Sequence, residues 1–254
     1  MNCNKYIHEK AKIGKNFVSG CNVIIEEDVV IGDDVYVGHN VIIKKGTIIG
    51  SGVKIEDNAV LGRMPIRSKI SATTQEKELP PLKIGNEVRI GSLVVIYRGA
   101  VIGDNVFVAD LASVREDVEI GEYTVVGRGV TVENRVKIGK YCKLETEAYI
   151  TAISIIEDYC FIAPEVTFTN DNFLGRTEER FKYHKGVHVK KGARIGANAT
   201  FLPGIVVGED ALVAAGSVVT RDVPARTIVM GVPAKPVRNV PEEQLLENQT
   251  YYKG

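Results

Sequence analysis

The chain has 254 residues, of which 44% are hydrophobic and 25% charged. It is therefore long enough to bury a large core, which excludes a disulfide-stapled miniprotein and a disordered tail. Its 32 Lys and Arg balance 32 Asp and Glu, and this zero net charge argues against a protein whose whole surface binds nucleic acid or an anionic membrane.

The N-terminal ten residues are polar and lack an apolar signal core, and the longest uncharged apolar run, residues 211–219, is far too short to span a bilayer. We therefore expect a soluble, cytoplasmic protein. Its four cysteines form no CxxC pair and it has only four histidines, so we expect no zinc cluster and no metal cofactor.

An apolar residue recurs every six positions through residues 7–61, 84–168 and 189–219. Of the 31 positions in these runs, only Ser19 is not Ile, Leu, Val or Phe, whereas the composition alone would give about 14 apolar residues. A period of six fits neither a helix nor strand alternation carried through hairpins, but it fits short strands separated by regular corners. Three such units close a triangle, so about ten coils of 18 residues stack through parallel backbone hydrogen bonds. The pattern predicts one elongated all-β domain.

The apolar residue of the repeat is often followed by Gly, as in Ile13-Gly14 and Ile195-Gly196, and the fifth position is mostly small. This pattern resembles the hexapeptide-repeat acyltransferases from residue 7 to about residue 219. The resemblance implies a left-handed parallel β-helix, although the general crossover rule favours right-handed connections.

Two segments interrupt the phase of the repeat. Leu61 and Ile84 are 23 residues apart, and Phe168 and Val189 are 21 apart, so the chain must leave the stack in excursion loops at residues 62–83 and 169–188. The first contains several cations, and we interpret it as a wall of a substrate site; the alternative is a solvated insertion. The second turns basic after residue 175. Such a run of charge is usually a solvated face, and the alternative, on a loop beside coils rich in Gly and Ala, is a phosphate-binding collar.

The segments that begin at Ile195, Val213 and Met230 are rich in small residues, which permit close backbone approach by a long ligand. They resemble the C-terminal coenzyme A groove of the same family, so the resemblance implies acetyl-CoA as cosubstrate. It places the backbone of three residues against the pantetheine arm of coenzyme A, and four cations near the phosphates of coenzyme A. The backbone residues are Ala197, Ala215 and Gly216, and the cations are Lys190, Lys191, Lys235 and Arg238. In the C-terminal tail, residues 224–254, the stretch 241–248 is expected to form a short capping helix.

Sugar and antibiotic O-acetyltransferases of this class usually have a histidine base in a loop where this chain has Thr-Asn-Asp-Asn, residues 169–172. That loop, residues 114–118 and residues 144–152 instead resemble N-acyltransferases that act on thymidine-diphosphate (dTDP) amino-dideoxyhexoses. The resemblance implies transfer of acetyl from acetyl-CoA to the sugar amine for cell-surface glycan synthesis. It also implies a homotrimer with its sites in the grooves between subunits.

The amine must be neutral to attack a thioester, so an acceptor for its proton assists the reaction. Glu145 and Glu147 are two apart on one coil and both point outward. We expect them to converge with Asp171 on the amine as catalytic groups. The alternatives are solvated or subunit-bridging glutamates and an aspartate that caps its own turn. The remaining candidates, for binding the nucleotide sugar, are Asn170, Arg63 and Arg67.

Three other functions compete with this interpretation: sugar O-acetylation, a non-catalytic β-helix scaffold, and a metal-dependent hydratase. A hydratase needs three converging histidines, and His8, His39, His184 and His188 do not fall at one-coil spacings.

Two of the cysteines are also predicted to stack. Cys142 and Cys160 are one coil apart at the small fifth position. Stacked strands would bring them within disulfide range, but we expect two small core residues.

Overall fold

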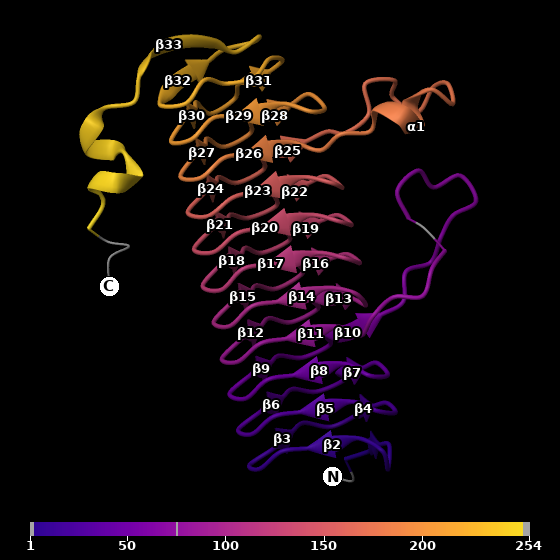
Figure 1. The fold of residues 1–254 in the computed structure, drawn as a ribbon. Coiled ribbons are helices and arrows are strands. Elements are labelled where there is room, and N and C mark those ends of the chain that lie inside the picture. The colour runs from indigo at the N-terminus through magenta and orange to yellow at the C-terminus, as the bar shows by residue number, and fades with distance from the viewer. Residues whose placement is uncertain (1–2, 75, 251–254) are drawn as a thin grey trace.

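The computed structural model describes residues 3–74 and 76–250. Its strands wind into three parallel sheets that form the faces of a triangular prism (Figure 1). Sheet A has 11 strands, sheet B has 10 and sheet C has 12, which is slightly more than the ten coils predicted.

Sheet A contains β1 (Lys5–Ile7), β4 (Val23–Ile25), β7 (Ile42–Ile43), β10 (Val60–Arg63), β13 (Val95–Tyr97), β16 (Ser113–Val114), β19 (Thr131–Val132), β22 (Tyr149–Ile150), β25 (Thr167–Phe168), β28 (Thr200–Phe201) and β31 (Val218–Val219). Sheet B contains β2 (Lys12–Ile13), β5 (Val30–Ile31), β8 (Ile48–Ile49), β11 (Lys83–Ile84), β14 (Val101–Ile102), β17 (Glu119–Ile120), β20 (Lys137–Ile138), β23 (Ile155–Ile156), β26 (His188–Val189) and β29 (Val206–Val207). Sheet C contains β3 (Val18–Ser19), β6 (Tyr36–Val37), β9 (Lys54–Ile55), β12 (Arg89–Ile90), β15 (Phe107–Val108), β18 (Val125–Val126), β21 (Lys143–Leu144), β24 (Phe161–Ile162), β27 (Arg194–Ile195), β30 (Leu212–Val213), β32 (Thr227–Met230) and β33 (Lys235–Asn239).

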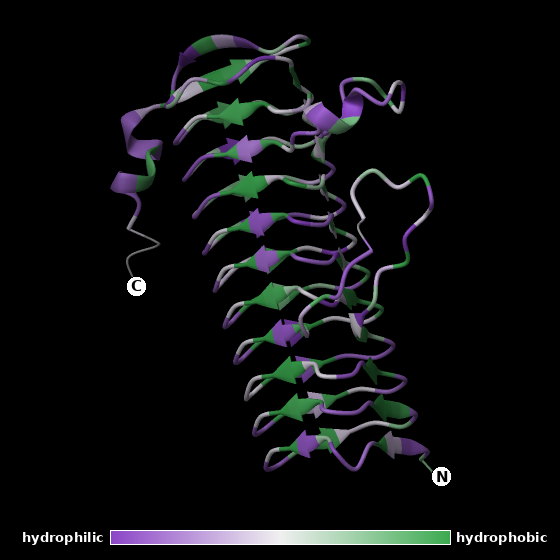
Figure 2. Ribbon diagram, turned by 45° about the vertical axis from the view of Figure 1, so that its right-hand side comes forward, coloured by the Kyte–Doolittle hydropathy of each residue, from purple (hydrophilic) through white to green (hydrophobic). Residues whose placement is uncertain are grey.

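The inward residue of nearly every strand belongs to one continuous core. Figure 2 shows hydrophobic residues recurring in the strands of successive coils. Ile25, Leu144 and Phe201 are fully buried. Ile7 is an exception at 43% exposed, because it lies in the first coil and no further coil covers it. Ile13 and Ser19 of the same coil are half-buried. From Ile25 on, the prediction that the six-residue period marks the core is confirmed.

The corners of the coils require a left-handed backbone. Asn16, Asp28 and Asn40 have φ values of 56°, 59° and 57°, and Gly46 and Gly52 take the same place in later coils. Asn, Asp and Gly tolerate this region better than other residues. They fill many of the corners, but Leu93, Tyr123 and Ile153 take the same left-handed conformation in later coils, so the stack also holds other residues in it.

Neither excursion changes the register of the strand pairing. β8 pairs with β11 (Lys83↔Ile48), and β23 pairs with β26 (Ile155↔His188), as if the intervening residues were absent. The predicted loop excursions are thus insertions into an otherwise unbroken stack.

The C-terminal tail differs from the expected single capping helix. β32 adds one more strand to sheet C, and β33 returns antiparallel to it. Two turns of 3₁₀ helix follow, η1 (Glu242–Gln244) and η2 (Leu246–Asn248). So short a segment is not a stable α-helix by itself, and it is anchored by Leu245 and Val240, which pack on Ile228.

Cys142 and Cys160 are buried and not bonded to each other, as predicted, while Cys3 and Cys21 form a disulfide. In the described ranges, no helix has the length and apolar character needed to cross a membrane.

Phe168 and Phe201 make an edge-to-face contact in the upper core, with ring centroids 5.1 Å apart, and neither is exposed. We expect Phe168→Ala to cost about 3–5 kcal/mol of the free energy of unfolding, because it removes aromatic burial and leaves a cavity. Urea unfolding followed by circular dichroism measures this cost. Phe107→Ala, which truncates a half-exposed outward ring, is the control; equal losses in both variants would contradict the core assignment.

Candidate functional site

Both excursions emerge at the edge where the chain passes from sheet A to sheet B, here called the A–B edge. Excursion 1 comprises residues 64–82 and excursion 2 comprises residues 169–187, which include the four-residue helix α1 (Arg180–Tyr183). Figure 1 shows both projecting from the same side of the prism, with several coils between their points of departure. The interruptions of the repeat therefore gather at one edge.

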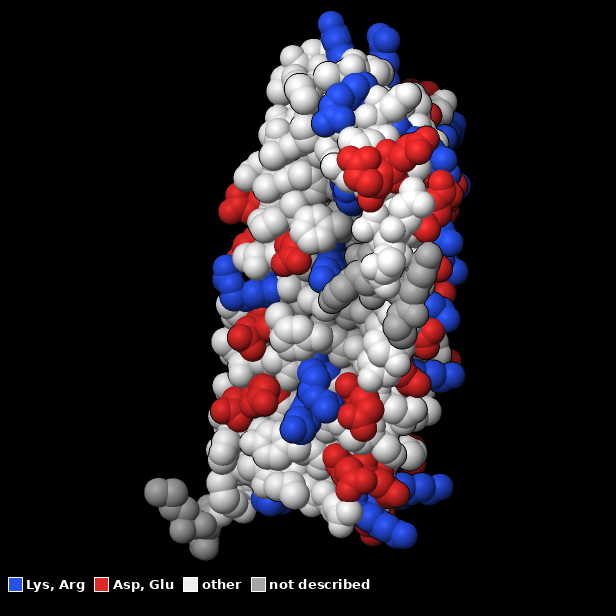
Figure 3. Space-filling view, turned by 90° about the vertical axis from the view of Figure 1, so that its left-hand side faces the viewer, with Lys and Arg blue, Asp and Glu red and all other residues white. Residues whose placement is uncertain are grey.

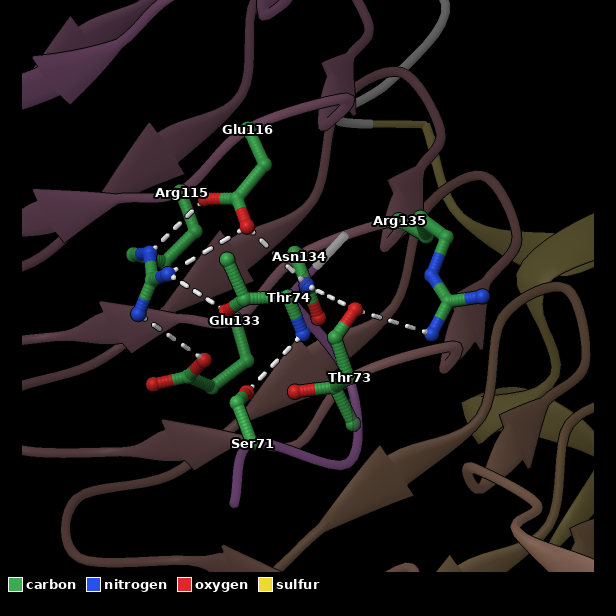
Figure 4. A network of polar contacts seen from close by, with 8 residues as sticks. All are labelled: Ser71, Thr73, Thr74, Arg115, Glu116, Glu133, Asn134 and Arg135. Atoms are coloured by element: carbon green, nitrogen blue, oxygen red, sulfur yellow. Dashed lines mark hydrogen bonds and ion pairs between the residues drawn. The ribbon is translucent and has the colours of Figure 1, made fainter. Parts of the chain in front are cut away.

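Excursion 1 is held on the coils by a polar network (Figure 4). Arg115 Nη2 donates to Thr74 Oγ1 at 3.1 Å, and Asn134 Nδ2 donates to the Thr73 carbonyl at 2.8 Å. Asn134 Nδ2 also donates to Glu116 Oε1 at 3.0 Å. The tip of excursion 1 is thus fixed beside the coils as a wall of the A–B edge.

Arg115 connects this network to a second acid. Its Nε donates to Glu116 Oε2 at 2.9 Å, its Nη1 lies 3.6 Å from Glu133 Oε2, and its guanidinium stacks over Tyr97 at 4.9 Å from the ring centroid. Burial raises the pKa of the Glu133 carboxyl; Arg115 opposes that rise and the Glu116 carboxylate adds to it.

The sequence had not pointed to Arg115, Glu116, Glu133 or Asn134 as site residues. A signal was available, because Arg115 and Glu133 are 18 residues apart and so stack on successive coils. Both also follow directly on strands of sheet A, as excursions 1 and 2 do.

A cavity of about 580 Å³ lies between the two excursions. It is lined by Arg67, Lys69, Ile70, Ser71, Ala72, Thr74 and Glu76 of excursion 1 and by Phe181 of α1. Arg67 Nη1 is 3.9 Å from Glu76 Oε2, and Arg63 lies over Tyr97, 5.5 Å from the ring centroid. Both predicted substrate-binding arginines are therefore at the A–B edge, and Arg67 faces the cavity.

Asp171 organises excursion 2. Its carboxylate accepts hydrogen bonds from the backbone N–H groups of Phe173 (2.8 Å) and Gly175 (2.9 Å) and from Arg180 Nη1 (3.0 Å). Burial opposes ionisation, but the backbone donors, Arg180 and nearby His184 outweigh it and lower the pKa of Asp171 to about 2. These contacts match the alternative in which Asp171 caps its own turn. Asn170 is beside it, and its carbonyl accepts from the Lys185 N–H at 3.3 Å.

The pKa of Asp171 predicts a pH-dependent order in excursion 2. Because the folded value of about 2 is below the ordinary 3.8, the carboxylate stabilises the loop fully above about pH 5 and loses this effect as the pH falls from about 4 to 2. We expect pepsin to cleave excursion 2 more slowly in the wild type than in Asp171→Asn at pH 4, and at similar rates in the two proteins at pH 2. The comparison at one pH cancels the pH dependence of pepsin itself, and the same ratio of rates at both pH values would refute the assignment.

Glu145 and Glu147 lie elsewhere, at the edge where the chain passes from sheet C to sheet A (the C–A edge). Glu147 Oε1 pairs with Arg128 Nη1 at 3.1 Å. The expectation that these two glutamates and Asp171 converge is therefore wrong within one protomer. The prediction relied on the short distance in sequence between the two glutamates and Asp171. Strands β22 to β25 lie between Glu147 and Asp171, so these residues are on different edges.

The residues that were expected to bind coenzyme A lie in three separate places. Ala197, Ala215 and Gly216 share the C–A edge, where the Gly216 N–H donates to the Ala197 carbonyl at 2.8 Å. A Cβ added at Gly216 would meet nothing within 4 Å, so this strip of backbone is open to a ligand. The other two places are the edge between sheets B and C and the C-terminal hairpin.

Lys190 and Lys191 follow β26, at the edge between sheets B and C, and Lys190 Nζ is 3.2 Å from Glu157 Oε1. The other two cations, Lys235 and Arg238, are exposed on β33. Lys235 lines a cavity of about 520 Å³ together with residues 219–224, 229, 233, 234 and 236. Figure 3 shows acids and bases interspersed over most of the face that it displays, with basic side chains gathered at the end that carries β33. Any phosphate contact on that face is local, as the net charge implied.

The described residues contain no group of three His, Cys, Asp or Glu side chains placed to hold a metal ion.

Comparisons with known proteins identify the repeat. The family model "Bacterial transferase hexapeptide (six repeats)" matches residues 28–63, 99–134 and 186–221. A second, "Hexapeptide repeat of succinyl-transferase", matches residues 81–109. This chain belongs to the hexapeptide-repeat acyltransferase family.

Curated relatives of this family member match over short segments. A 2,3,4,5-tetrahydropyridine-2,6-dicarboxylate N-acetyltransferase of Staphylococcus aureus is 50% identical over 58 residues, which is 23% of this chain and 24% of that protein. A putative acetyltransferase of Schizosaccharomyces pombe is 39% identical over 57 residues, 22% of this chain and 28% of that protein. The chain thus spans about a quarter of the length of these relatives.

Solved structures match over most of the chain. A UDP-N-acetylglucosamine acyltransferase from Bacteroides fragilis superposes with a TM-score of 0.55 at 22% identity, covering 92% of this chain and 72% of that one. Another UDP-N-acetylglucosamine acyltransferase gives 0.53 at 18% identity, covering 92% and 71%. This likeness confirms the predicted left-handed parallel β-helix.

Proposed function

We propose that this protein transfers an acetyl group from acetyl-CoA to the amine of a dTDP-linked amino-dideoxyhexose. The observation that carries the proposal is the open strip of small residues at the C–A edge, in a member of an acyltransferase family. A cavity with basic residues at the A–B edge supplies a place for the anionic sugar nucleotide. The sequence of excursion 2 supports an amine as the acceptor, because it lacks a histidine at residues 169–172.

The two proposed binding regions lie on different edges of the prism. Ala197, Ala215 and Gly216 are at the C–A edge, whereas Arg67 and Phe181 are at the A–B edge. Sheet A separates them, so one copy does not present thioester and sugar to each other. If the C–A edge of one copy faces the A–B edge of the next, a closed ring of three copies contains three equivalent sites. This geometry supports the homotrimer.

In such a site the sugar amine attacks the thioester carbonyl directly, and no covalent enzyme intermediate is needed. Arg67 and Lys69 bind the diphosphate, excursion 2 orders the sugar, and the backbone at the C–A edge aligns the pantetheine arm. Positioning of the two reactants is the main contribution expected of the protein.

Release of free coenzyme A thiol tests the acceptor class. We expect release when acetyl-CoA is mixed with a dTDP-3-amino-3,6-dideoxyhexose or its 4-amino counterpart, and none with the matching hydroxyl sugar. Release with the hydroxyl sugar alone would establish the competing O-acetyltransferase. If calorimetry detects no binding of coenzyme A at all, the protein is a scaffold and the proposal fails.

A further inference from the structure

Glu133 occupies a distinctive place on the A–B edge. It follows β19, on one of the two coils that anchor excursion 1, and precedes the coil from which excursion 2 departs. The equivalent positions on the neighbouring coils of this edge are Tyr97, Arg115, Thr151 and Thr169. Glu133 is therefore the one carboxylate among these five stacked positions, and its side chain is 22% exposed.

We propose that Glu133 is the catalytic residue that accepts the proton of the attacking amine, held in place by Arg115 beside the cavity between the two excursions. This inference rests on the proposed function, since it requires an acyl acceptor that loses a proton.

Geometry supports this position. Arg115 lies 3.6 Å from Glu133 and donates to Thr74, and Thr74 is itself part of the cavity wall (Figure 4). One guanidinium therefore ties the acid to excursion 1. A hydrogen-bond acceptor nearby is also unused. Asn134 Oδ1 is buried and has no hydrogen-bond partner among the described residues.

The charged and titratable groups around Glu133 set its proton affinity. On its own coil the Asn134 N–H donates to it; Arg115 and Glu116 face it from the coil before, and Tyr149 from the coil after. Burial raises its pKa despite Arg115, which suits a base that must take up a proton near neutral pH. Asp171, whose pKa is lowered to about 2 by hydrogen bonds within its own loop, is poorly suited to this role.

The proton balance is complete without a further reactant. The amine nitrogen forms a bond to the thioester carbon, and the carbonyl π electrons move to oxygen. The ammonium of this adduct gives one proton to the Glu133 carboxylate. As the oxyanion collapses, the C–S bond breaks, and protonated Glu133 returns the proton to the departing thiolate. The products are the amide and coenzyme A thiol.

The test compares thiol release by the full-length protein and by Glu133→Gln across pH 5 to 9. We expect the substitution to lower kcat by about 100-fold. The fraction of neutral amine in the free sugar is divided out of each kcat/KM value; the corrected wild-type profile should still have an acid limb, on which activity falls toward acid pH, and the corrected Glu133→Gln profile should lack it. Glu133→Asp, which keeps a carboxylate near Arg115, should retain that limb at an intermediate rate, and it provides the test if the glutamine variant does not fold. Glu119→Gln is the control, because Glu119 pairs with Lys137 on sheet B and is 58% exposed.

The outcomes separate the two proposals. If the wild type releases thiol and Glu133→Gln matches it in rate and pH profile, Glu133 is not the proton acceptor and the proposed function stands. A lower rate with an unchanged acid limb would also overturn the inference, because a merely structural residue gives that result. If the wild type releases no thiol with any amino sugar, the proposed function fails and the inference falls with it.

Discussion

Deletion of residues 171–185 is expected to lower kcat/KM by at least about 100-fold while the prism stays folded. The six-residue repeat explains why the prism should stay folded. Joining Asn170 to Gly186 leaves Val189 six residues after Phe168, so the phase of the stack is restored. Gly186 then takes the left-handed corner, and Val187 keeps the buried position that it already occupies.

The loss of activity follows from what the deletion removes. Asp171, Arg180 and Phe181 disappear together, and with them the wall that faces excursion 1 across the cavity. Calorimetry should show unchanged binding of coenzyme A, because the C–A edge is untouched. A deletion variant with wild-type kinetics would remove excursion 2 from the site.

Ala215→Trp is expected to weaken coenzyme A binding by at least about 100-fold, equivalent to about 2.7 kcal/mol. Ala215 is exposed on the C–A edge beside Gly216, where the backbone is open. An indole there fills the strip that the pantetheine arm must approach. The corner itself tolerates side chains, because Asn198 has a left-handed φ of 58° one coil below Gly216.

Ser92→Trp is the matched control for this substitution, since Ser92 lies two residues after the inward Ile90, as Ala215 does after Val213. It adds the same bulk on the same edge, several coils away from the proposed groove. Equal binding of coenzyme A to the wild type and Ala215→Trp would show that the cofactor binds elsewhere.

The period of six predicts most of the fold because each repeat makes the same local contacts. An inward residue such as Val132 needs only its counterparts 18 residues away, Val114 and Ile150, to complete its layer. The same reasoning identifies both excursions, since a chain that loses phase must leave the stack. The hairpin of β32 and β33 has no such repeat, and its packing through Val240 and Leu245 was not visible in the pattern.

The site was harder to predict than the fold. Arg63, Arg67 and Asn170 all lie at the A–B edge, because each belongs to an excursion or its point of departure. Arg115 and Glu133 were missed because their contacts depend on how the tip of excursion 1 folds back on the coils. Repeat phase places the coils, but it carries no information about the path of an insertion.

The proposed function depends most on a site shared by the C–A edge of one copy and the A–B edge of another. Mixing of subunits tests this directly. Co-expressed Ala215→Trp and the 171–185 deletion each retain one intact edge, so randomly mixed trimers should recover about a quarter of the wild-type activity per site. Each variant alone should keep about a hundredth of the wild-type activity or less, measured with acetyl-CoA well below saturation. If the mixed protein is no more active than the separate variants although its subunits exchange, thioester and acceptor meet on a single chain and the shared site is wrong.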